Sequence, residues 1–150
     1  MMDPVKLTKF RNDFVTIVGP NFPVLYHGTK DLEFAIGIAQ KAGFHSEQAF
    51  RAKYCQNGLG GTAIYGPGIY LTDSLKEAKS YGCHILEFRF HQSADYLDVF
   101  NPAISKAAVK SAGGGKQTIL SEINLSVLLR VTQNYYVLRS PYLVSPSMNG

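Results

Sequence analysis

The segment at residues 84–90 (HILEFRF) alternates between apolar and charged side chains from Leu86 onward. Leu86, Phe88 and Phe90 fall on one face of this segment, and its charged side chains fall on the other. A period of two is typical of a β-strand that is buried on one face only. This strand needs partner strands and a core to cover its apolar face, so the chain is expected to build a sheet.

The rest of the chain divides into short apolar segments and a few helical patterns. Further strands are predicted at residues 24–26, 68–71, 96–99, 135–138 and 142–144. Helices are predicted at 31–42, 74–81, 104–112 and 118–131, a helix or irregular apolar segment at 5–18, and a glycine-rich loop at 51–68. The strands outnumber the helices and do not alternate with them regularly. We therefore predict an α+β fold with a small antiparallel or split sheet.

Two positions carry helix-start signals. Ser74 and Glu77 form a capping-box pattern, in which the serine hydroxyl bonds a backbone N–H and the glutamate reaches back to the first residue. The helix that they open is expected to end at Gly82. The hydroxyl of Thr29 either supports a binding site or caps the next helix, and the capping interpretation is favoured.

Size and composition set the class of protein. A chain of 150 residues with 45% hydrophobic residues forms one domain, residues 1–150, with a core of its own. No apolar run approaches the roughly 20 residues that span a bilayer, and the first residues show no signal peptide, so no membrane partner is expected. The two cysteines, Cys55 and Cys83, exclude a disulfide scaffold and favour a reducing, cytoplasmic location.

The charge and the common motifs narrow the chemistry further. A net charge of +4 is compatible with a nucleic-acid partner, but the basic residues form no run and favour an ordinary solvated surface. The four histidines show no metal-binding spacing, so no metal site is predicted. Dinucleotide-binding, Walker and nucleophilic-serine motifs are also missing from the sequence.

One set of motifs is specific. Residues 26–29 (YHGT) end a predicted strand, and residues 65–74 (YGPGIYLTDS) lead into a helix that ends near Tyr81, eleven residues after Tyr70. In this order and spacing, residues 24–90 resemble the catalytic domain of ADP-ribosyltransferases of the poly(ADP-ribose) polymerase, or diphtheria-toxin-like, branch. The resemblance implies a split β-sheet with flanking helices and NAD as co-substrate.

The resemblance also implies roles for single residues. His27 would donate to a ribose hydroxyl of NAD, and the backbone of Gly28 would bond the nicotinamide carboxamide. Tyr70 and Tyr81 would hold the nicotinamide ring between them, and Thr29 belongs to the same NAD-binding motif. Physical chemistry supports these roles, because aromatic rings attract a flat cationic ring and glycine permits close backbone approach.

Two positions depart from the family pattern. Ala78 stands where family members often carry a serine that bonds the nicotinamide amide. No glutamate opens a late strand, where the family places its third catalytic residue. Asn134 is the preferred candidate for this position. The alternatives that remain open are Gln133, Ser140, Pro141 and Glu122.

These residues predict a mono-ADP-ribosyltransferase, with His27, Tyr70 and Asn134 as catalytic residues and a protein or nucleic acid as acceptor. Polymer synthesis is not expected, because the family requires the missing glutamate for chain elongation. An NAD glycohydrolase and an inactive module that binds NAD or ADP-ribose remain the alternatives. The small size resembles bacterial toxin or effector domains, which implies action in a target-cell cytosol and an immunity partner.

Overall fold

The computed structural model describes residues 4–40, 69–90, 93–112, 127–138 and 144–149. The helices are α1 (Pro4–Phe14), α2 (Leu32–Ala39), α4 (Leu75–Tyr81) and α5 (Pro102–Ala112). The strands are β1 (Thr16–Val18), β2 (Leu25–Thr29), β3 (Ile69–Thr72), β4 (His84–Phe90), β5 (Ala94–Asp98), β6 (Val127–Arg130), β7 (Tyr135–Leu138) and β8 (Val144–Asn149). The predicted α+β class is confirmed, whereas the predicted loop at 51–68 lies outside the described residues.

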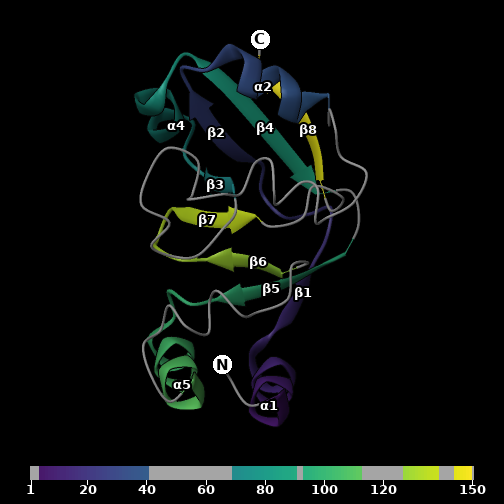
Figure 1. The fold of residues 1–150 in the computed structure, drawn as a ribbon, viewed down its shortest axis with the longest axis vertical. Coiled ribbons are helices and arrows are strands. Elements are labelled where there is room, and N and C mark those ends of the chain that lie inside the picture. The colour runs from purple at the N-terminus through teal and green to yellow at the C-terminus, as the bar shows by residue number, and fades with distance from the viewer. Residues whose placement is uncertain (1–3, 41–68, 91–92, 113–126, 139–143, 150) are drawn as a thin grey trace.

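The eight strands form one sheet in the order β1-β5-β6-β7-β3-β2-β4-β8. Its pairs are antiparallel except for β5 and β6, which run parallel. Strand β2 pairs with β4 along its whole length, but it pairs with β3 only through Tyr26 and Thr72. We call this junction of β2 and β3 the seam. It divides the sheet into an upper group (β2, β4, β8) and a lower group (β1, β5, β6, β7, β3), whose strands run steeply across each other (Figure 1).

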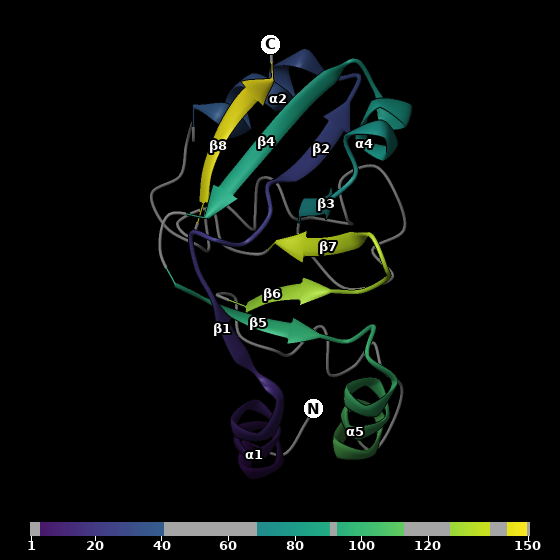
Figure 2. The same cartoon turned by 180° about the vertical axis from the view of Figure 1, so that it is seen from behind.

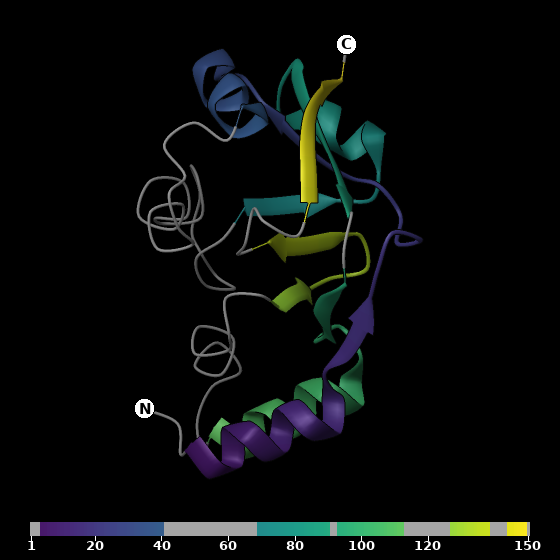
Figure 3. The same ribbon diagram turned by 90° about the vertical axis from the view of Figure 1, so that its right-hand side faces the viewer.

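Helices cover both groups of strands. Figure 3 shows α2 and α4 on opposite sides of the upper group, and α4 also contacts β3 across the seam. Helices α1 and α5 contact each other and lie side by side at the far end of the lower group (Figure 2). The ends of the sheet are therefore differently covered, and α4 contacts strands on both sides of the seam.

Two clusters of buried side chains fill the faces of the sheet. One joins α2 to strands of both groups and contains Leu25, Leu86 and Leu128. The other joins the lower group to α1 and contains Phe10 and Leu129. Neighbouring residues of β6 thus enter different clusters, which shows that this strand is buried on both faces.

The predicted helix at 118–131 is wrong at its C-terminal end, because Val127–Arg130 form β6. Leu128 and Leu129 are both fully buried. A strand that is covered on both faces shows no alternation, and its continuous apolar run cannot be distinguished from a buried helix by periodicity. Residues 118–126 lie outside the described part of the chain.

The N-terminal segment also differs from its prediction. Helix α1 ends at Phe14, and the predicted single segment at 5–18 continues as strand β1, which pairs with β5. Thr16, Ile17 and Val18 are all β-branched, and such residues favour a strand. The strand predicted at 142–144 begins at Val144 and runs to Asn149, while residues 142–143 lie outside the described residues.

The capping box at the start of α4 is half confirmed. The Ser74 hydroxyl accepts a hydrogen bond from the backbone N–H of Glu77 at 3.2 Å, and Gly82 is the C-cap of the helix, which ends at Tyr81. The glutamate side chain does not reach back to the cap. Its carboxylate instead accepts a hydrogen bond from the hydroxyl of Tyr135 on β7, a residue 58 positions away in the sequence.

Candidate active site at the seam

His27 connects the two sides of the seam. Its Nδ1 lies 2.7 Å from the backbone carbonyl oxygen of Tyr70 on β3. If the β2–β3 pairing continued beyond Tyr26 and Thr72, a backbone group of β2 would face this carbonyl. The imidazole takes that place, so the carbonyl keeps a donor where the two strands separate.

The same hydrogen bond fixes the protonation of His27. A carbonyl oxygen only accepts, so Nδ1 carries the proton. Burial lowers the pKa of His27 below its ordinary value, and the hydrogen bond to Tyr70 offsets this only in part. The ring is therefore neutral at pH 7, and Nε2 presents a lone pair. Nε2 of His27 is thus placed to accept a hydrogen bond, and the expected contact of His27 with a ribose hydroxyl stays a prediction.

Gly28 is required for a packing reason. A Cβ at this position would overlap the backbone carbonyl oxygen of Ala78 and lie 2.7 Å from its carbonyl carbon. Helix α4 thus approaches β2 more closely than any side chain on Gly28 allows, and the Ala78 side chain is fully buried in this contact region. The close contact holds α4, and with it Tyr81, beside the end of β2.

Thr29 is not the cap of α2. The N-cap is Asp31, whose carboxylate accepts from the backbone N–H of Phe34 at 3.0 Å. The Thr29 hydroxyl accepts from the backbone N–H of Asp31, also at 3.0 Å. Thr29 therefore shapes the turn between β2 and α2, and the favoured capping interpretation is wrong by two residues.

Tyrosines from three elements gather on one face beside the seam. Tyr70 pairs with Val137, and Tyr135 lies two residues before Val137 on β7, so both tyrosines lie on one face of the sheet. On that face they pack against the buried cluster that contains Phe10 of α1. The ring of Tyr81 meets the ring of Tyr135 edge-on, at 6.4 Å between centroids and 89° between planes. Tyr81 is 56% exposed, so this residue is accessible to a ligand.

Tyr135 and Glu77 are further candidate site residues, which the sequence interpretation missed. The Tyr135 hydroxyl donates to Oε2 of Glu77 at 2.7 Å and lies 3.1 Å from the Tyr81 hydroxyl. Burial, followed by the hydrogen bonds to Tyr81 and Glu77, raises the pKa of Tyr135, so its hydroxyl stays protonated. One signal was available, because Glu77 and Tyr81 are four residues apart and share one face of α4.

Asn134 precedes β7 and is exposed. Its backbone carbonyl accepts from the backbone N–H of Asp73 at 3.2 Å. The adjacent Gln133 is also exposed, and its backbone carbonyl accepts from the Arg130 guanidinium. Ser140, Pro141 and Glu122 lie outside the described residues. Of the residues at the start of β7, Tyr135 is the one whose side chain reaches Tyr81.

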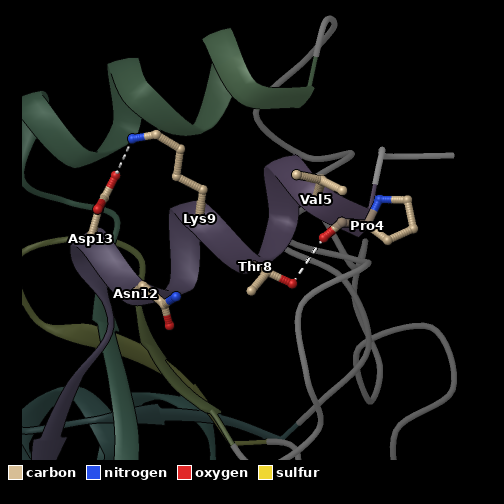
Figure 4. Close-up of a pocket in the computed structure, with 6 residues that line it drawn as sticks. All are labelled: Pro4, Val5, Thr8, Lys9, Asn12 and Asp13. Carbon is tan, nitrogen blue, oxygen red and sulfur yellow. Dashed lines mark hydrogen bonds and ion pairs between the residues drawn. The ribbon is translucent and has the colours of Figure 1, made fainter.

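A hollow on the molecule is lined by none of these residues. It is lined by Pro4, Val5, Thr8, Lys9, Asn12 and Asp13, all from one helix, α1 (Figure 4). Lys9 and Asp13 form an exposed ion pair of 3.1 Å across one side of it. We assign this hollow no role in the site.

Comparison with known proteins adds no identification. No protein-family model matches the chain, and no curated protein matches it. Within the described residues, no group of three histidine, cysteine or acidic side chains is placed to hold a metal ion. None of the helices described is long and apolar enough to span a bilayer. The functional assignment therefore rests on the residues at the seam.

Proposed function

We propose that this chain is a mono-ADP-ribosyltransferase that binds NAD at the seam. It cleaves the bond between nicotinamide and ribose and transfers ADP-ribose to a protein or nucleic acid. The observation that carries this proposal is the 2.7 Å hydrogen bond from His27 to the Tyr70 carbonyl, which holds a neutral imidazole across the seam. In this view the sheet is an ADP-ribosyltransferase-like split sheet, and the seam is its split.

The residues of the seam bind NAD in distinct ways. Nε2 of His27 accepts a hydrogen bond from a ribose hydroxyl. Beyond Tyr26, β2 has no registered partner on its β3 side among the described residues, so the backbone of Gly28 is available to the carboxamide. The exposed Tyr81 attracts the cationic nicotinamide ring. Tyr70 lies on the same face of the sheet as Tyr135, whose ring contacts that of Tyr81.

Cleavage moves charge from the ring to the sugar. The ribose–nitrogen bond breaks, and nicotinamide leaves as a neutral molecule with both bonding electrons. The ribose carbon carries the positive charge until the acceptor nucleophile bonds to it and releases its proton. Groups that stabilise this charge more strongly than the starting sugar accelerate the step. Tyr135, polarised by Glu77, fits this role better than Asn134, whose described contact is made by its backbone carbonyl.

The test uses NAD that carries a label on its adenine and on its nicotinamide. Nicotinamide release with label retained on a macromolecule supports the transferase, and the sensitivity of that label to protease or nuclease identifies the acceptor class. Release with free ADP-ribose supports the glycohydrolase instead. NAD binding without release supports an inactive module, and a folded chain that neither binds nor cleaves NAD contradicts the proposal.

A further inference from the structure

Three side chains beside the seam form one continuous chain of hydrogen bonds. It runs from Tyr81 on α4, through Tyr135 on β7, to Glu77 on α4. The hydroxyl oxygens of the two tyrosines are 3.1 Å apart, and the Tyr135 hydroxyl lies 2.7 Å from Oε2 of Glu77. We refer to these residues as the tyrosine–glutamate chain. It ties the helix that carries the exposed ring to the first residue of β7.

The carboxylate sets the direction of every proton in this chain. Tyr135 has a single hydroxyl proton, and it donates that proton to Glu77. The Tyr81 hydroxyl must therefore donate to the Tyr135 oxygen, since the reverse bond would need a second proton on Tyr135. The oxygen of Tyr135 has two lone pairs, and Tyr81 occupies one. The other lone pair is left to accept a hydrogen bond.

The negative charge of Glu77 also acts on the Tyr135 oxygen. Hydrogen bonds to ionised groups are stronger than those between neutral groups, and hydrogen-bonded groups in a chain polarise one another. Donation to a carboxylate thus increases the electron density on the phenolic oxygen. Glu77 is exposed, whereas Tyr135, which carries the polarised oxygen, is half-buried.

We propose that Glu77 is a positioning residue that acts through Tyr135 to stabilise the ribose cation formed when NAD is cleaved. This inference rests on the proposed function. Glu77 fixes the Tyr135 proton away from the sugar, so that the polarised oxygen of Tyr135 faces it as an acceptor. The sequence has no glutamate at the start of β7, and the structure places the Glu77 carboxylate from α4 against the hydroxyl of Tyr135, the first residue of β7.

The first test is Glu77→Gln, which keeps the size of the side chain and an oxygen that accepts from Tyr135 but removes the charge. We expect kcat for nicotinamide release to fall about ten- to a hundredfold, the scale of one hydrogen bond to a charged group. The KM for NAD is expected to stay unchanged, because the contribution is made in the transition state. Lys79→Gln on the same helix is the matched control, with unchanged kcat.

A double variant separates positioning from a structural role. Tyr135→Phe removes the group through which Glu77 acts, so adding Glu77→Gln to it is expected to cause no further loss of kcat. Losses that multiply in the double variant, or a Glu77→Gln variant with the kcat of the wild type, overturn the inference while leaving the proposed function intact. A wild-type chain without nicotinamide release overturns both.

Discussion

The upper and lower groups of strands are each continuously paired, but the seam between them is not. In the upper group, β2 pairs with β4 from Leu25 to Thr29, and in the lower group β3 pairs with β7 from Ile69 to Thr72. The seam holds one registered pair. The histidine comes from the upper group and two of the tyrosines from the lower group. The candidate chemistry thus lies where the backbone pairing is shortest.

The largest effect on stability is expected from placing a side chain between β2 and α4, which are in close backbone contact at Gly28. Gly28→Ala places a methyl group against the backbone of Ala78, which has no rotamer with which to move away. We expect a loss of about 3 kcal/mol in the free energy of unfolding, the upper range for overpacking. Gly19→Ala, with no atom within 4 Å of the new Cβ, is the control for denaturant unfolding. Equal stability of the two variants would show that the backbone of α4 does not lie in close contact with Gly28 of β2.

Cutting the link across the seam tests the role of His27. In His27→Asn, the amide nitrogen replaces Nδ1 as donor to Tyr70, but nothing replaces Nε2. We expect a folded protein whose nicotinamide release falls on the order of a hundredfold, as for loss of a preorganised catalytic contact. His84→Asn, on the neighbouring strand β4, serves as the control. Full activity in His27→Asn would move the site away from the seam.

The pH dependence of stability sharpens the same comparison. Burial lowers the pKa of folded His27 below its ordinary value of 6.5, so the unfolded chain binds a proton more readily than the folded one. The contribution of His27 to stability is complete above pH 6.5 and is lost as the pH falls through the lowered folded value. Unfolding measured from pH 7.5 downward is expected to show this loss in the wild type and a smaller one in His27→Asn. Identical profiles would mean that His27 is not held neutral.

The smallest effect is expected where α4 meets the lower group. Tyr135→Phe removes the hydrogen bonds to both Tyr81 and Glu77, whereas Tyr81→Phe removes only one of them. We expect Tyr135→Phe to cost about 1 kcal/mol of stability, and Tyr81→Phe to cost less. Thermal unfolding of both variants makes the comparison. A greater loss in Tyr81→Phe would contradict the assignment of two hydrogen bonds to Tyr135 and one to Tyr81.

The elements around the seam were predictable because their signals are local. The alternation at 84–90, the strand before residue 29 and the cap at Ser74 each depend on neighbouring residues. Strand β6 was not predictable in this way, since burial on both faces removes the alternation that marks a strand. The contact of Glu77 with Tyr135 joins residues far apart in the sequence, and the capping pattern gave Glu77 a sufficient local explanation.

The central claim is that NAD binds against Nε2 of His27, and nitrogen-15 NMR of the histidine side chains tests it directly. At pH 7 we predict a neutral His27 with its proton on Nδ1, and a shift of its Nε2 resonance when NAD is added, while His84 does not change. A charged His27, or a His27 Nε2 resonance that millimolar NAD leaves in place, would contradict this account.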